Sequence, residues 1–208
     1  MSVFYLDAPL KDADIMDLRI GDLVYISGTV FTCRSRLHRY VLDEGHPMPP
    51  AAGDQNVLIH VGPVIVPDDT KGWNLLSFMP TSSIRFEKWG ARSVDEWNLK
   101  MIIGKTTMGK TTADMMRKKK CVHCTPQGIT PNLFIDHIKV LGVDYMDELG
   151  SIEAVWYLKL DKLGPFVVDI DCAGNNLFDE LDKTIEEKKK EAYHITGVPE
   201  DFKFTKLY

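Results

Sequence analysis

Hydroxyl and cationic side chains follow two apolar segments of the chain. Residues 79–85 (MPTSSIR) come after the apolar residues 73–78, and residues 104–109 (GKTTMG) come after the apolar residues 99–103. Short apolar runs bounded by Gly or Pro predict strands, and α/β proteins bind ligands at the carboxyl ends of strands. Arg85 offers a planar fork that matches a carboxylate, and Lys105 offers a compact point charge. The pattern indicates an anion site; the alternative is a turn that carries a surface Arg and Lys.

A third cationic cluster lies near residue 34. Arg34, Arg36, His38 and Arg39 directly follow the apolar residues 23–31. If this segment is helical, Arg34 and His38 share one face at the i, i+4 spacing. Backbone N–H groups at the start of such a helix would add to anion binding. A solvated basic helix face is the alternative interpretation.

The loop at residues 104–111 also fits the P-loop pattern G-x-x-x-x-G-K-[ST], which binds nucleotide phosphates. A predicted strand precedes it and a predicted helix follows. Asp169, at the end of a second apolar run, could supply the carboxylate that holds magnesium. Against this interpretation, the first ninety residues are almost all strand and loop. We therefore expect no regular alternation of strand and helix and no βαβ unit around this loop.

The remaining elements are predicted from periodicity, turns and caps. Strands are expected at residues 23–31, 57–66 with a break at Gly62-Pro63, 73–78, 99–103, 140–145, 154–160 and 166–171. Capping boxes predict helices that start near Ser93 and Thr111, and Thr130-Pro131 predicts a helix through Ile138. Gly28 within the first strand predicts a bulge or a close backbone approach. His60 is expected to be a buried, hydrogen-bonded histidine.

Composition limits the function classes. The chain has 208 residues, of which 44% are hydrophobic, and a net charge of −5, so we expect one domain at residues 1–180 and a charged helical tail at residues 181–208. The acidic balance gives no footprint for nucleic acid, and no apolar run reaches the length of a membrane helix. Four cysteines without a signal peptide predict reduced thiols in the cytoplasm. Cys121-x-x-Cys124 lacks the second pair of a zinc site, so we expect no metal ligands in this chain.

Seven short motifs, taken in order, resemble the β subunit or C-terminal domain of the iron–sulfur hydro-lyases, the group of class I fumarase and L(+)-tartrate dehydratase. The matching motifs are Gly21-Asp22 with Ser27-Gly28-Thr29, Thr32-Cys33-Arg34 with His38-Arg39, Gly62-Pro63, Pro80-Thr81-Ser82 with Arg85, Gly104-Lys105 with Met108-Gly109, Asp147-Glu148-Leu149-Gly150, and Asp171 with Gly174-Asn175-Asn176-Leu177. The resemblance implies an α/β fold of the swivelling β/β/α type, in which helices flank a central mixed sheet.

The resemblance also implies an activity and a set of roles. The activity is reversible dehydration of a 2-hydroxy dicarboxylate, either malate to fumarate or L-tartrate to oxaloacetate. Thr81 would be the catalytic base, while Arg34, Arg85 and Lys105 would bind the substrate carboxylate, Arg85 and Lys105 also stabilising charge during the reaction. His38 would orient Arg34 or contact the substrate. A partner α subunit would hold a [4Fe–4S] cluster and cover an exposed apolar face of this chain, and the αβ unit is expected to allow homodimerisation.

One departure from the family pattern affects these expectations. The family has Gly-Lys-Gly-Gly-Met-Gly at the lysine loop, and this chain has Thr106 and Thr107 in place of two glycines. Glycine takes positive φ and permits close backbone approach, which β-branched residues resist. We therefore expect a different loop conformation, a different substrate or weakened catalysis. A non-catalytic dicarboxylate-binding module of the same fold is the alternative function.

Overall fold

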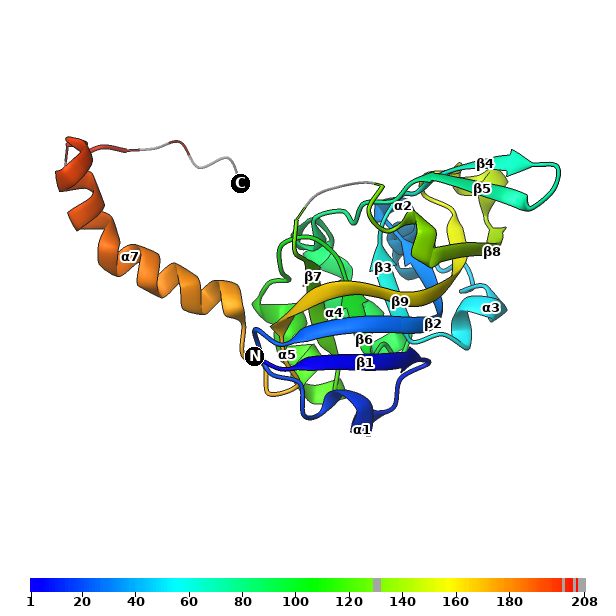
Figure 1. Cartoon of the computed structure of the whole chain (residues 1–208), viewed down its shortest axis with the longest axis horizontal. Coiled ribbons are helices and arrows are strands. Elements are labelled where there is room, and N and C mark those ends of the chain that lie inside the picture. The colour runs from blue at the N-terminus through cyan, green and yellow to red at the C-terminus, as the bar shows by residue number, and fades with distance from the viewer. Residues whose placement is uncertain (129–131, 200, 204, 206–208) are drawn as a thin grey trace. The chain divides into compact units, whose positions relative to one another are not determined.

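The structure is a computed structural model that describes residues 1–128, 132–199, 201–203 and 205 (Figure 1). It divides into two units, residues 1–176 and residues 177–208. The second unit begins with helix α7 (Leu177–Thr196), whereas the charged tail was expected from residue 181. No helix among the described residues is both long enough and apolar enough to cross a bilayer.

The first unit is built on a seven-stranded mixed sheet in the order β1-β2-β3-β6-β7-β9-β8 (Figure 1). Its strands are β1 (Val3–Ala8), β2 (Leu23–Cys33), β3 (Val57–His60), β6 (Met101–Ile103), β7 (Val122–Pro126), β8 (Ile138–Asp144) and β9 (Val155–Ile170). The first five strands in this order are parallel, and β9 is antiparallel to its neighbours. Because β2 also pairs with β9, the pairings β2–β3–β6–β7–β9–β2 form a closed circuit. Strands β4 (Val64–Asp68) and β5 (Gly72–Ser77) form a separate hairpin.

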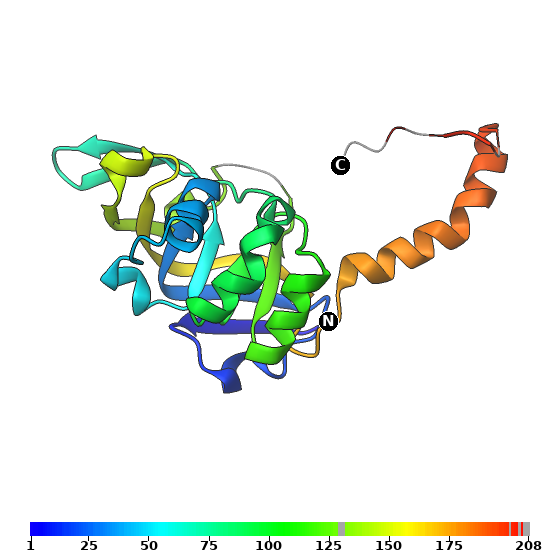
Figure 2. The same cartoon turned by 180° about the vertical axis from the view of Figure 1, so that it is seen from behind.

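Short helices connect the strands, and the two longest of this unit cover one face. The helices are α1 (Asp12–Ile15), α2 (Ser35–His38), η1 (Arg39–Asp43), α3 (Pro50–Gly53), η2 (Ser83–Phe86), α4 (Glu87–Glu96), α5 (Lys110–Lys119), η3 (Ile135–His137) and α6 (Met146–Leu149). Helices α4 and α5 lie side by side against the parallel strands (Figure 2). An ion pair between Asp95 and Lys119 joins them.

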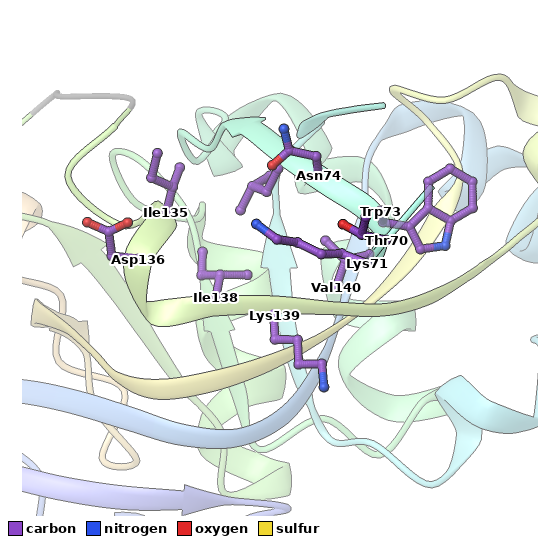
Figure 3. A pocket seen from close by; sticks show the side chains of 10 residues that line it. Thr70, Lys71, Trp73, Asn74, Ile135, Asp136, Ile138, Lys139 and Val140 are labelled. Atoms are coloured by element: carbon purple, nitrogen blue, oxygen red, sulfur yellow. The ribbon is translucent and has the colours of Figure 1, made fainter. Parts of the chain in front are cut away.

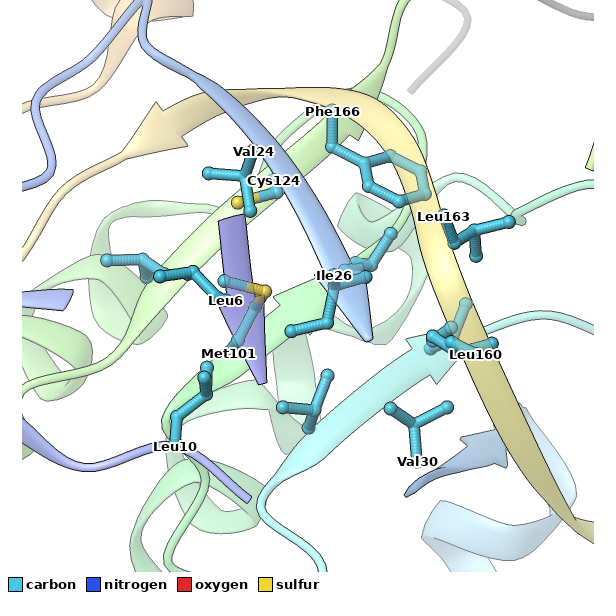
Figure 4. Packing of buried hydrophobic residues seen from close by; sticks show 14 of the residues in the cluster. Leu6, Leu10, Val24, Ile26, Val30, Met101, Cys124, Leu160, Leu163 and Phe166 are labelled. Atoms are coloured by element: carbon cyan, nitrogen blue, oxygen red, sulfur yellow. The ribbon is translucent and has the colours of Figure 1, made fainter. Parts of the chain in front are cut away.

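Two of the parallel strands, β3 and β6, are buried on both faces. Val57 and Ile59 of β3 belong to one hydrophobic cluster, which Figure 4 shows between the strands of the circuit. Leu58 points to a second cluster, which includes Val94 and Met116 beside the two helices. Burial on both faces explains why β3 and β6 have continuous apolar sequences rather than alternating ones.

Most predicted strands are confirmed. Strands are present at residues 23–31, 73–77, 101–103 and 140–144, and the predicted break at Gly62-Pro63 separates β3 from β4. The two strands expected at residues 154–160 and 166–171 are instead one strand, β9, which continues through Gly164 at φ +153°. Gly28 has φ +100° beside a register shift, and a Cβ there would lie 2.2 Å from the carbonyl oxygen of Ala8. Both predictions for Gly28 are therefore confirmed.

Three helix predictions need correction. Helix α4 begins at Glu87, so Ser93 is in its last turns, where its hydroxyl donates to the carbonyl of Gly90. Thr130 and Pro131 lie outside the described residues, and Ile138 begins β8 instead of continuing a helix. The expectation that no βαβ unit surrounds residues 104–111 is wrong, because β6, α5 and the parallel strand β7 form one. The expectation came from the strand-rich first ninety residues, whereas the alternation of strand and helix lies after them.

Candidate functional site

Parallel strands bring two of the predicted cations to one edge of the sheet. In the register, Cys33 pairs with His60 and Ile59 pairs with Ile103. The carboxyl ends of β2, β3 and β6 therefore lie together. Arg34 is the first residue after β2, and Lys105 follows β6 by two positions. This edge is where ligands bind in sheets of this kind.

The segment that carries Thr81 is tied to the same edge through its main chain. The Thr81 amide donates to the carbonyl of His60 across 2.5 Å, and the Lys105 amide donates to the carbonyl of Thr81 across 2.9 Å. The Ser83 amide donates to the carbonyl of Lys105 across 2.9 Å, and Ser82 forms a parallel bridge with Lys105. The hydroxyl of Thr81 and the ammonium of Lys105 are thus on adjacent, hydrogen-bonded strands of chain.

Gly104 is required for this close approach. A Cβ at that position would lie 2.0 Å from Ser83 Oγ and 3.1 Å from the carbonyl oxygen of Thr81. Its backbone amide donates to the carbonyl of Cys124. A glycine inside an apolar strand end therefore allows the two site segments to pack against each other.

Arg34 lies across the edge from Lys105, against the loop after β3. A Cβ on Gly62 would lie 2.6 Å from one Arg34 Nη atom, so the guanidinium packs on the Gly62 backbone. Arg34 Nε is 3.7 Å from Glu153 Oε1, and this nitrogen is buried without a hydrogen-bond acceptor. Sequence reasoning did not identify Glu153, because its position next to Arg34 depends on the fold of β9.

Arg85 and Lys105 leave positive charge at the edge. Arg85, in η2, is exposed, and Lys105 is half-buried. Within the described part of the chain, neither forms an ion pair with a carboxylate.

His38 lies beneath this edge rather than on it. The side chain has no exposed surface, and its ring stacks with Phe86, Trp89 and Trp97 at centroid distances of 5.3–5.5 Å. Its Nδ1–H donates to the carbonyl of Arg34 across 3.0 Å. Burial lowers the pKa of His38 to about 4, so the ring is neutral at pH 7. The structure places Thr81, Arg34 and Lys105 at one edge, Arg85 in the short helix that follows Thr81, and His38 under Arg34.

A carboxylate occupies the helix N-terminus that a P-loop would offer to phosphate. Glu87 accepts hydrogen bonds from the amides of Gly109 and Thr112 at 2.7 and 3.1 Å and from the Thr112 hydroxyl at 2.7 Å. Lys110 pairs with Asp114 on its own helix. Because Glu87 accepts from two of the N–H groups at the start of this helix, a carboxylate stands where a P-loop would bind phosphate. The sequence match to the P-loop pattern is a coincidence.

The cysteines do not form a metal site. Cys33, Cys121, Cys124 and Cys172 are free and buried, and burial raises the pKa of each thiol, that of Cys172 to about 11. Among the described residues, no group of three or more His, Cys, Asp or Glu side chains is placed to hold a metal ion. These thiols therefore do not fit an iron–sulfur cluster. Both Cys121 and Cys124 are buried as predicted, but only Cys124 lies in a strand, because β7 begins one residue after Cys121.

Sequence reasoning also missed a buried polar group under the site. His60 shares a hydrogen bond with Ser83, which confirms its prediction as a hydrogen-bonded core histidine. His123 and Asp169 extend this group. The sequence did carry one sign of this group, because His60, His123 and Asp169 are polar residues within apolar segments.

A cavity of about 620 Å³ lies elsewhere, between the β4–β5 hairpin and β8 (Figure 3). Lys71, Trp73 and Asp136 are among the residues that line it. None of the five predicted site residues does so. The candidate site is therefore an open edge of the sheet rather than this cavity.

Comparisons with known proteins agree on one group. Residues 2–181 match the sequence model of a family described as Fumarase C-terminus. L(+)-tartrate dehydratase subunit beta of Escherichia coli (strain K12) is 30% identical over 184 residues, which cover 88% of this chain and 90% of that protein. Putative fumarate hydratase class I of Geobacillus stearothermophilus is 31% identical over 189 residues, which cover 89% of this chain and 35% of that longer protein. Putative L(+)-tartrate dehydratase subunit beta of Methanocaldococcus jannaschii is 29% identical over 185 residues, which cover 88% of this chain and 94% of that protein.

Proposed function

The chain belongs to the fumarase C-terminus family, and from this membership we propose that it is the β subunit of a hydro-lyase that reversibly dehydrates a 2-hydroxy dicarboxylate. Its relatives are named for tartrate dehydratase and fumarate hydratase, so the substrate is L-tartrate or malate. The observation that carries the proposal is the pairing of Thr81 with Lys105 at the edge that also holds Arg34.

The three cations would stabilise the negative charge that develops in this reaction. Removal of a proton from the carbon beside a carboxylate builds negative charge on that carboxylate. Arg34, Arg85 and Lys105 would bind it, and fixed cations aimed at developing charge lower the barrier. Arg85 and Arg34 suit the two oxygens of a carboxylate, and Lys105 supplies a point charge.

Thr81 is the proposed base for this proton. A threonine hydroxyl is a poor base at its ordinary pKa, and neighbouring positive charge favours its ionised form. The main-chain hydrogen bond to Lys105 keeps a cation on the adjacent strand. His38 is then a positioning residue, because it holds the Arg34 carbonyl and is too deeply buried to contact substrate.

A partner subunit would bind the hydroxyl group that leaves the substrate. We propose that an α subunit holds the [4Fe–4S] cluster and covers the cationic edge, because the thiols of this chain do not fit such a cluster. Ile84, beside Arg85, is 46% exposed, and Ile152, beside Gly62, is 49% exposed, so apolar surface surrounds the site. In this proposal the domain has the swivelling β/β/α form, the free thiols reflect a cytoplasmic setting, and two αβ units associate.

The experiment is anaerobic co-expression of this chain with an α-type subunit of the family, followed by cluster reconstitution. Malate dehydration is measured by the absorbance of the new double bond, and tartrate dehydration is measured in parallel. We expect turnover of one acid that requires both chains and falls by about 10²–10³ with Arg85→Ala or Lys105→Ala. Lys71→Ala, in the cavity away from the edge, is the matched control and should keep full activity. If neither acid turns over with an intact cluster while a dicarboxylate still binds, the chain is a binding module instead.

A further inference from the structure

Four buried side chains form a continuous hydrogen-bonded array beneath the candidate site. Asp169 Oδ1 is 2.6 Å from His123 Nδ1, and His123 Nε2 is 2.8 Å from Ser83 Oγ. Ser83 Oγ is also 2.9 Å from His60 Nδ1. Each of the four residues is at most 1% exposed. Burying this much polar surface is costly unless it is fully hydrogen-bonded, and such arrays fix the geometry of their surroundings.

Ser83 is the member that connects the array to the site. It lies between Thr81 and Arg85, and its main-chain amide donates to the carbonyl of Lys105. Through its hydroxyl, it is bound to β7 by His123 and to β3 by His60. The segment that carries the proposed base and one cation is thus attached to three different strand ends by one serine.

The number of protons on these side chains determines which group donates each hydrogen bond in the array. Asp169 Oδ1 accepts from Nδ1–H of His123. When this ring carries one proton, its Nε2 accepts from the Ser83 hydroxyl. Because a hydroxyl donates only once, Ser83 must then accept from Nδ1–H of His60. His60 Nε2 is left without a proton, which agrees with its burial without a hydrogen-bond partner in the described chain. Burial lowers the pKa of His60, so this ring is neutral at pH 7.

Asp169, His123 and Ser83 have the connectivity of a hydrolase triad, but the array does not serve as one. A nucleophilic serine must reach its substrate, and Ser83 has no exposed surface. Gly104 packs directly over its hydroxyl, because a Cβ there would lie 2.0 Å from Ser83 Oγ. A role in positioning remains.

We propose that Ser83, His60, His123 and Asp169 are positioning residues that hold Thr81 and Arg85 in register with Lys105. This inference rests on the proposed hydro-lyase function for its effect on catalysis. Loss of the Ser83 hydroxyl removes the side-chain hydrogen bonds to His60 and His123 and leaves the segment held by main-chain hydrogen bonds alone, so the base and the cations lose their alignment. The effect falls on kcat more than on KM, because misalignment costs the transition state more than the bound ground state.

The first test uses the full chain alone and needs no activity. Nitrogen-15 NMR of the histidine rings should show His60 as the neutral Nδ1–H tautomer at pH 7 and His123 with its Nδ1–H bonded to Asp169. Ser83→Ala should shift both rings and speed amide exchange at Lys105 at least tenfold. Ser93→Ala is the matched control, since Ser93 is equally buried and its hydroxyl donates one hydrogen bond within α4. An Nε2–H tautomer at His60, or Lys105 exchange unchanged by Ser83→Ala, overturns the proposal.

The second test uses the reconstituted enzyme with its α subunit. Ser83→Ala should lower kcat by 10- to 100-fold with KM changed less than threefold, Ser83→Cys should restore part of kcat, and Ser93→Ala should match the parent. Ser83→Cys also serves where Ser83→Ala does not fold, because it retains the size of the side chain. Equal kcat in Ser83→Ala and Ser93→Ala overturns the positioning role. If the parent enzyme itself has no hydro-lyase activity, the proposed function fails, and the NMR test still decides whether the array holds Lys105 in place.

Discussion

Lys105 and Thr81 are joined by a main-chain hydrogen bond of 2.9 Å, so the proposed base and a cation come from two distant segments on a shared backbone frame. Their side chains can change without breaking this link. Substitutions at either position therefore test chemistry more than folding.

Thr81→Ala should lower kcat by about 10²–10⁴, because it removes the proposed proton acceptor. Thr81→Ser should keep most of the activity, since it retains the hydroxyl. Steady-state kinetics of the reconstituted enzyme measure both, with Ser82→Ala, the next hydroxyl in the segment, as control. Full activity in Thr81→Ala would remove Thr81 from the mechanism.

Glu87→Ala should destabilise the chain by about 1–3 kcal/mol, because the amides of Gly109 and Thr112 would lose their buried acceptor. Urea unfolding measures the loss. Glu96→Ala is the control on the same helix, since Glu96 forms an exposed pair with Arg92 and should cost less than about 1 kcal/mol. Similar losses for both variants would contradict the capping role of Glu87.

Thr106→Gly should stabilise the chain by up to about 1 kcal/mol. Thr106 has φ +61°, a left-handed conformation that costs a β-branched residue roughly 1–2 kcal/mol and costs glycine nothing sterically. Thr107→Gly is the matched control; Thr107 lacks a positive φ, so glycine there should destabilise by about 0.5–1 kcal/mol. Thermal unfolding compares the two, and a loss of stability in both would show that Thr106 is not strained.

Stability should fall as pH decreases from 6.5 toward 4. The pKa of His38 is lowered by burial to about 4 from its ordinary 6.5, so the unfolded state binds more protons in this window. The contribution of His38 is present above pH 6.5 and is lost on acidification, about 3 kcal/mol in all at 1.36 kcal/mol per pH unit. His38→Phe keeps an aromatic ring against Trp89 and should flatten the slope.

Urea unfolding at several pH values gives this slope. His194→Gln, at an exposed histidine of α7, is the control and should leave the slope unchanged. A slope in His38→Phe that equals that of the parent would mean that His38 titrates normally in the folded chain.

The four thiols should react with an aromatic disulfide reagent only as fast as the chain opens. Burial withholds them from the reagent and raises their pKa values, so little thiolate exists at pH 8. Absorbance should show four thiols in denaturant and almost none under native conditions. Rapid native reaction of even one thiol would contradict its burial.

Local sequence was sufficient for most strands, although β1 was not predicted and β9 was predicted as two strands. The strand ends at Ile103 and His60 were predicted because Gly and Pro follow buried apolar runs. Gly28 was predicted as a bulge because glycine in a strand has few other uses. The motifs that resemble the hydro-lyases named Thr81 and Lys105, which the fold brings together.

Long-range contacts could not be predicted in this way. Glu87 caps a helix that begins at Lys110, and Glu153 reaches Arg34 from the turn before β9, so each role depends on topology. Thr106 was expected to resist positive φ, and the surrounding loop nevertheless imposes it. His123 next to Asp169 follows from the pairing of β7 with β9, which no sequence period indicates.

Because Glu153 lies close to Arg34, its carboxylate competes with any anion that binds at the proposed site. Because this carboxylate is tethered 3.7 Å from the guanidinium, it acts at a high effective concentration. An external anion must therefore compete with Glu153 for the charge of Arg34. A monoanion that meets Arg34 alone gains little by this exchange. A dianion whose second group reaches other cations would gain much more, so if Arg34 binds substrate as proposed, Glu153 would favour ligands with two acidic groups.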